Sequence, residues 1–137
     1  MKNQIYRAIA IFSLFFSLAA VNAQAQAPSK VEVEIPFEFS AGKATLPAGV
    51  YSIKRLSGNF LQLQNVDDKQ AAILNAPLNL TSNDPNAVER LVFNKHDGEY
   101  YLAQIWLTSD TGRELFVSRK TAKSERIEIA LHTTRRQ

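Results

Sequence analysis

Residues 31–39 alternate strictly between apolar and polar side chains, and this pattern constrains the fold more than any other feature of the chain. Apolar residues occupy every odd position, and glutamates occupy three of the four even ones. Because successive side chains of a β-strand point to opposite faces, such alternation predicts a strand with one buried face. Pro36 lies on the polar face and cannot donate a ladder hydrogen bond, so we expect the strand either to lie at a sheet edge or to bulge there.

Turn residues divide the rest of the chain into short segments. Leu-Pro-Ala-Gly at residues 46–49 predicts a type I turn in which Gly49 takes a positive φ. Residues 75–86 contain two prolines and several Asn, Asp and Ser residues, so a connecting loop is expected there. A turn or loop is also expected over residues 108–112, and residues 113–123 fit either a strand or a short helix. Further strands are expected over residues 50–56, 60–66, 70–74 and 126–131.

Asp97-Gly98 is the strongest local signal in the sequence. This dipeptide is typical of two-residue hairpin turns, in which both central residues need a positive φ. It predicts a hairpin between strands over residues 89–96 and 99–107. In that register Phe93 lies opposite Leu102, and Val92 lies opposite Ala103.

These segments together predict an all-β domain. About seven or eight short strands are joined mainly by tight turns, and no amphipathic stretch is long enough for a crossover helix. An antiparallel meander should therefore close as a small barrel or fold over as a two-sheet sandwich. The sequence does not choose between them, because both bury alternate residues of every strand.

Residues 1–25 have the features of a secretory signal peptide. Lys2 and Arg7 flank a positive head, and residues 8–21 form an apolar run that is too short to span a membrane comfortably. Small residues follow at the spacing that a signal peptidase needs, ending at Ala23 and again at Ala25. We therefore expect a signal helix that is cleaved off, which leaves residues 26–137 as a single domain in the periplasm or outside the cell.

The charge and cysteine content exclude several function classes. The sequence has 16 basic and 13 acidic residues, and the signal takes away two basic ones, which leaves 14 against 13. Such a near-neutral surface has no long-range field that would attract nucleic acid. Because the chain has no cysteine, it can form neither a disulfide framework nor a thiolate nucleophile or metal ligand. No membrane-spanning segment is expected in residues 26–137.

No catalytic motif stands out. The sequence contains no Gly-x-Ser-x-Gly elbow, no His-Glu-x-x-His pair and no phosphate-binding glycine-rich loop. His96 lies beside Asp97 and near Glu99, but Asp97 is already explained by the turn, so no metal site and no cofactor are expected. Other polar groups read as solvated surface, namely His132, the glutamates at 32, 34 and 38, and the acidic residues at 110 and 114.

Aromatic side chains are the more promising group. Tyr100 and Tyr101 are adjacent, so they must point to opposite faces of their strand, and one of them is expected to be exposed. Outward Tyr or Trp side chains can stack on a sugar or contact a partner strand. We therefore take Tyr100, Tyr101 and Trp106 as the candidate ligand-binding residues, although such residues also commonly just cover a β-domain.

Four segments together resemble a group of small exported bacterial β-domain proteins of unknown function. They are Pro-Phe-Glu-Phe at 36–39, Leu-Pro-Ala-Gly-Val-Tyr at 46–51, Ala-Gln-Ile-Trp at 103–106 and Gly-Arg-Glu-Leu at 112–115. The resemblance implies an exported β-rich domain and carries no activity or site residue. The segment at 46–51 is also similar to a turn in prealbumin-like and carboxypeptidase-regulatory sandwich domains, which implies a binding or structural module.

The sequence thus favours a non-catalytic exported binding module whose partner is an envelope protein, a glycan or a small apolar ligand. Two alternatives stay open. One is a small envelope hydrolase or metal-dependent enzyme that uses His96. The other is a structural subunit of the cell envelope that adds a strand to a neighbour through residues 31–39, which look like an edge strand.

Overall fold

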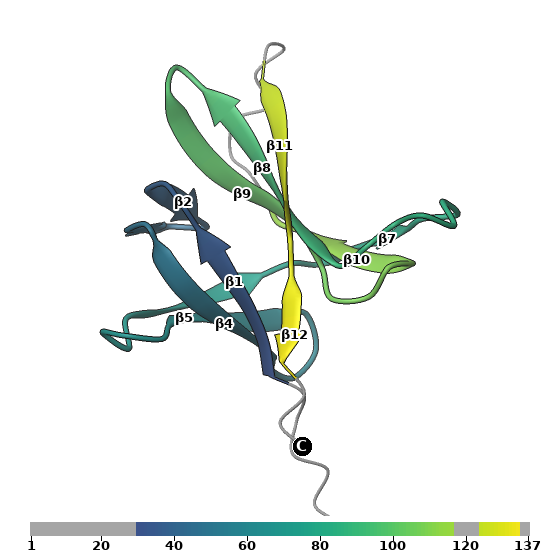
Figure 1. The fold of residues 1–137 in the computed structure, drawn as a ribbon, viewed down its shortest axis with the longest axis horizontal. Coiled ribbons are helices and arrows are strands. Elements are labelled where there is room, and N and C mark those ends of the chain that lie inside the picture. Colours follow the sequence, from purple (N-terminus) through teal and green to yellow (C-terminus); the bar gives the residue numbers. More distant parts are fainter. Residues whose placement is uncertain (1–29, 117–123, 135–137) are drawn as a thin grey trace, which may run out of the picture.

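The computed structural model describes residues 30–116 and 124–134, and the predicted signal segment lies outside them. Within these ranges the chain is all-β, as predicted, and the strands form two open sheets that pack as a sandwich (Figure 1). Neither sheet closes on itself, so the sandwich alternative is confirmed over the barrel. No helix in the described part is long and apolar enough to cross a membrane.

The first sheet has five strands, and every pair of neighbouring strands in it is antiparallel. The meander β1-β4-β5-β6 forms most of it, and β12 returns to the other side of β1. In spatial order the strands are β12 (His132–Thr134), β1 (Lys30–Ile35), β4 (Gly49–Arg55), β5 (Phe60–Asn65) and β6 (Ala71–Asn75).

The second sheet has seven strands, and one pair in it is parallel. The short strand β2 lies beside the first half of β9 and runs parallel to it, and the short strand β3 pairs with β2. The expectation of a purely antiparallel meander is therefore wrong at this pair. The main path is β11 (Glu125–Ala130), β8 (Arg90–His96), β9 (Glu99–Trp106), β10 (Thr111–Glu114) and β7 (Leu78–Thr81), with β2 (Phe39–Ala41) and β3 (Ala44–Leu46) off it.

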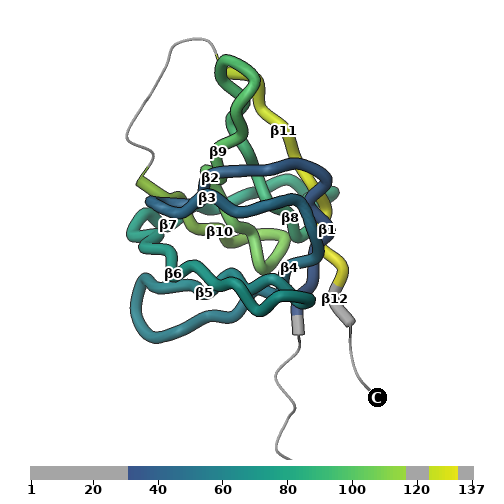
Figure 2. Tube along the Cα trace, turned by 90° about the vertical axis from the view of Figure 1, so that its left-hand side faces the viewer, coloured from purple at the N-terminus to yellow at the C-terminus, as the bar shows by residue number. Residues whose placement is uncertain are grey.

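The chain changes sheets at Pro36. Residues 31–39 do not form one strand, because β1 ends at Ile35 in the first sheet and β2 begins at Phe39 in the second. β1 lies between β12 and β4, so the expectation that it is an edge strand is wrong. The chain crosses back between β11 and β12, next to β1 (Figure 2).

The hairpin at Asp97-Gly98 is confirmed, with φ values of 49° and 80°. Phe93 lies opposite Leu102 as predicted, but Val92 lies opposite Gln104 rather than Ala103. Ala103 is the extra residue of a β-bulge, and its carbonyl oxygen accepts a 2.8 Å hydrogen bond from the N–H of Leu115. A bulge bends its strand. β9 can therefore pair with β2 before the bulge and with β10 after it.

Two segments that were expected to be loops contain strands. Within residues 75–86, β7 forms four pairs with β10 although prolines and turn residues flank it. β10 in turn begins inside the expected loop at 108–112. Of the ambiguous segment 113–123, residues 113 and 114 belong to this strand, and residues 117–123 lie outside the described ranges.

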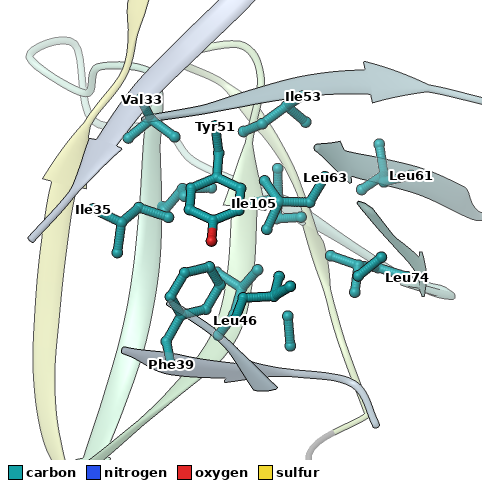
Figure 3. Packing of buried hydrophobic residues seen from close by; sticks show 14 of the residues in the cluster. Val33, Ile35, Phe39, Leu46, Tyr51, Ile53, Leu61, Leu63, Leu74 and Ile105 are labelled. Atoms are coloured by element: carbon teal, nitrogen blue, oxygen red, sulfur yellow. The ribbon is translucent and has the colours of Figure 1, made fainter. Parts of the chain in front are cut away.

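Side chains from both sheets meet in one apolar core (Figure 3). Phe39 packs edge-to-face against both Tyr51 and Phe93, with each pair of ring centroids 5.4 Å apart. Such aromatic pairs stabilise a fold beyond the area they bury. The alternating apolar residues of β1, β4, β5 and β6 face this core, so the pattern seen in the sequence is the packing pattern of the sandwich.

The turn at residues 46–49 departs from its prediction in one respect, because Gly49 does not have a positive φ. Glycine is needed there for space, since a Cβ atom at this position would lie 2.9 Å from Nδ2 of the buried Asn65. The hydroxyl group of Tyr51 donates a 2.6 Å hydrogen bond to the carbonyl oxygen of Pro47. The Leu-Pro-Ala-Gly-Val-Tyr segment is thus fixed both by a bond of its own and by its contact with Asn65 of β5.

Candidate functional site

The two predicted tyrosines point to opposite faces of β9, and both are half-buried. Tyr100 faces the core, where its ring stacks on Phe37 with centroids 3.8 Å apart and planes at 11°. The ammonium group of Lys95 lies 5.5 Å from the centre of the same ring. On the other face, the hydroxyl of Tyr101 donates to a carboxylate oxygen of Glu99. Both side chains are therefore engaged with other residues of the domain.

Trp106 is buried although it is on the outer face of the second sheet. Its indole N–H donates a 3.0 Å hydrogen bond to Oε1 of Gln104, and the guanidinium carbon of Arg90 lies 4.3 Å from the ring centroid. A Cβ atom on Gly112 would come within 2.5 Å of the ring, so only glycine allows this close contact. The structure does not bring Trp106 together with the tyrosines into one open aromatic surface.

His96 and Asp97 are in contact at the hairpin turn. The distance from Nε2 of His96 to Oδ2 of Asp97 is 3.1 Å, and the Asp97 side chain is largely exposed. Within residues 30–116 and 124–134, no three His, Asp or Glu side chains gather as a metal site would require. His132, the other histidine, is exposed and lies opposite Glu32 in the first sheet. A catalytic role for His96 stays a prediction.

A pocket that the sequence analysis did not foresee opens between the two sheets. It has a volume of about 130 Å³ and lies between β4 and β5 on one side and β9, β10 and the loop between them on the other. Its apolar lining residues are Leu61, Ile105 and Leu107, of which Leu61 and Ile105 are almost fully buried, so little apolar surface is open to a ligand. The remaining lining comes from Arg55, Thr111, Gly112 and Arg113.

Arg113 reaches across from the second sheet. It lies opposite the core residue Ile105, so its side chain is on the inner face of β10. Its Nη1 donates a 3.0 Å hydrogen bond to Oδ1 of Asn59 and a longer one, 3.5 Å, to the carbonyl oxygen of Ala76. Asn59 is in the turn between β4 and β5, and Ala76 follows β6, so this guanidinium links the two sheets.

Arg55 ends β4 on the same inner face, opposite Leu61. Its side chain is exposed, and it forms no hydrogen bond or ion pair within the part of the chain that the structure describes. The residues that line the pocket include two guanidinium groups and no carboxylate. Polar groups supply most of the surface that the pocket offers, and two positive charges are among them, an arrangement that can hold the polar end of a small molecule.

Sequence reasoning missed both arginines, although one signal was present. Tyr51, Ile53 and Arg55 are every second residue of β4, so they share the inward face of the strand. A charged residue that continues a run of buried positions indicates the end of a core or a polar group inside a cavity. Arg113 shows its inward position only through its pairing with Ile105, which the sequence does not reveal.

Comparisons with protein-family models, with curated proteins and with solved structures find no match to this chain. The resemblances carried by its four sequence segments therefore stay predictions. Function has to be argued from the pocket and from the surfaces of the domain.

Proposed function

We propose that this domain is a non-catalytic binding module of an exported protein, and that it takes a small ligand with an apolar body into the pocket between the two sheets. The pocket supports this proposal because it lies between the two sheets and places the half-buried Leu107 beside two guanidinium groups. Ligand sites are typically concave, with a few polar groups that fix the orientation of the ligand.

The volume of the pocket limits the size of the ligand. A cavity of roughly 150 Å³ accepts a benzene ring. The pocket here measures about 130 Å³, so it suits one aromatic ring or a branched chain of similar size. A longer molecule would have to extend into solvent past Arg55. Among the three partner classes predicted from the sequence, this favours the small apolar ligand over the glycan, since Tyr100 and Trp106 are already covered by other side chains.

The test is a melting-temperature screen against single-ring compounds, because a ligand that binds only the native state raises its melting temperature. We expect a rise that grows with ligand concentration in the unmodified protein. Leu107→Trp fills the pocket with a larger side chain and should abolish the rise. Val88→Trp adds the same side chain at an exposed position outside the lining and should leave it intact. A rise that survives Leu107→Trp would contradict the proposal.

A second candidate function is assembly with another copy of this chain through the edge of β6. Hydrogen bonds from the N–H of Asn65 to Gln70 and from the N–H of Ala76 to Asn59 fix the phase of this strand, so residues 71, 73 and 75 direct their backbone groups away from β5. β6 has no charged residue, and Ile73 is 68% exposed. Such an unprotected edge can pair with a further strand.

Analytical ultracentrifugation tests this assembly. If β6 joins two copies, the protein sediments as a dimer at micromolar concentration, and Ile73→Lys converts it into a monomer because two lysines would face each other across the new pair. Lys54→Gln, on the same outer face of the sheet, should leave the dimer unchanged. An unmodified protein that remains a monomer at all concentrations would rule this candidate out.

A further inference from the structure

We propose that the ligand of this pocket is a small organic anion, a single-ring carboxylate in its simplest form, and that Arg55 and Arg113 bind its charged end. This inference rests on the proposed function, since it assigns the polar part of the same ligand. Two arginines share the lining with no carboxylate, and polar groups supply most of its open surface, so the pocket favours a ligand that carries a negative charge.

The other described arginines each lie close to a carboxylate of the same domain. Arg90 and Arg126 both approach the carboxylate of Glu128, at 3.8 and 3.0 Å. Arg55 and Arg113, by contrast, have no carboxylate partner within residues 30–116 and 124–134. Two like charges that share one pocket repel each other, and a bound anion would remove this repulsion.

Arg113 is held in place by contacts that leave most of its donors unused. A guanidinium group has five N–H donors, and the two hydrogen bonds of Arg113 both start from Nη1. Nε and Nη2 therefore remain for a ligand. Since Asn59 and Ala76 already fix the side chain, binding through these donors orders little additional structure.

Arg55 supplies the second, more mobile contact. It is exposed and has no partner in the described ranges, so it can turn toward a ligand without first breaking an ion pair. The planar group of an arginine matches a carboxylate with two parallel hydrogen bonds, which are stronger than bonds between neutral groups. A carboxylate in the pocket would thus face one fixed and one adaptable guanidinium while its ring lies beside Leu107.

Isothermal titration calorimetry with three probes tests this inference on the protein expressed from the complete sequence. Benzoate carries the ring and the charge, benzyl alcohol carries a similar ring without the charge, and inorganic phosphate carries charge without the ring. We expect benzoate to bind at least about tenfold more tightly than either other probe, because charge-assisted hydrogen bonds add to the contact of the ring.

Arg55→Gln and Lys54→Gln form a matched pair of variants. They remove the same charge from adjacent residues of β4, but Lys54 lies opposite Gln62 on the outer face, whereas Arg55 lies opposite Leu61 on the inner face. Arg55→Gln should weaken benzoate binding about tenfold and leave benzyl alcohol binding unchanged. Lys54→Gln should change neither, which separates a direct contact from a general effect of net charge.

The outcomes distinguish this inference from the proposed function on which it rests. Equal affinity for benzoate and benzyl alcohol, with no effect of Arg55→Gln, would overturn the anion and leave the proposed function in place. Binding of inorganic phosphate as tight as that of benzoate would show that the ring adds nothing to binding, and the proposed function would fall while the arginines kept their role. No binding of any probe would overturn both.

Discussion

The two ends of β4 are built in opposite ways. At its start the side chains are closely packed and hydrogen-bonded: Tyr51 is fully buried and donates to Pro47, and Asn65 packs against Gly49. At its end, Arg55 faces inward beside a pocket and has no partner in the described part of the chain. The closed end stabilises the sandwich, whereas the open end leaves a guanidinium group exposed to solvent.

The largest expected effect comes from removing the Tyr51 ring. Tyr51→Ala should lower the free energy of unfolding by about 3–5 kcal/mol, because it leaves a cavity beside Phe39 in the centre of the core. Urea denaturation measures this loss. A loss below about 1 kcal/mol would contradict the contrast between the two ends of β4, since Tyr51 would then contribute no more to the free energy of unfolding than Arg55.

Gly49→Ala should cost about 1–3 kcal/mol through steric conflict with Asn65. Asn65 cannot move aside easily, since its Oδ1 accepts hydrogen bonds from the N–H groups of Asp67 at 2.9 Å and Asp68 at 3.2 Å. In the double variant Gly49→Ala/Asn65→Ala, the conflict disappears, so the combined loss should be smaller than the sum of the two single losses. Strictly additive losses in urea titrations would show that the two residues do not interact.

Tyr51→Phe isolates the hydrogen bond from the ring. The expected loss is about 1 kcal/mol, because the ring stays packed and only the bond to the Pro47 carbonyl disappears. Thermal denaturation of this variant and of Tyr51→Ala separates the contribution of the hydroxyl group to stability from that of the ring. A melting temperature unchanged from that of the unmodified protein would mean that losing the hydroxyl group as a donor to the Pro47 carbonyl costs no stability.

The smallest effect on stability is expected at the open end. Arg55→Gln should change the free energy of unfolding by less than about 0.5 kcal/mol, since the side chain is exposed and has no described partner to lose. The variant therefore separates binding from folding. A loss above about 1 kcal/mol in urea denaturation would assign Arg55 a structural role and weaken the contrast between the two ends.

Alternation in the sequence revealed which residues face the core, but it could not reveal which sheet they belong to. Residues 31–39 keep their phase across Pro36, with Val33, Ile35 and Phe39 all buried, while the chain passes from one sheet to the other. Both sheets face the same core, so the inward side stays inward through the change. A pattern of period two therefore does not reveal that the chain passes from one sheet to the other at Pro36.

Long-range pairing explains the other differences. The bulge at Ala103 lies where β9 changes neighbours from β2 to β10, and nothing in the local sequence records this change. β7 forms because β10 supplies a partner for a segment whose composition indicates a loop. The pocket was missed for the same reason, since Arg55 and Arg113 come from different sheets. Local turn chemistry, as at Asp97-Gly98, was predictable because neighbouring residues alone determine it.

The pairing of β12 with β1 joins two segments that are far apart in the sequence. The first sheet receives its outer strand only when β12 reaches β1, and the chain between them visits the second sheet at β2 and β3 and again from β7 to β11. Contacts between such distant segments form late, because the intervening chain loses much of its conformational freedom before they do. Until the chain makes its last crossing from β11 to β12, β1 is therefore paired with β4 alone.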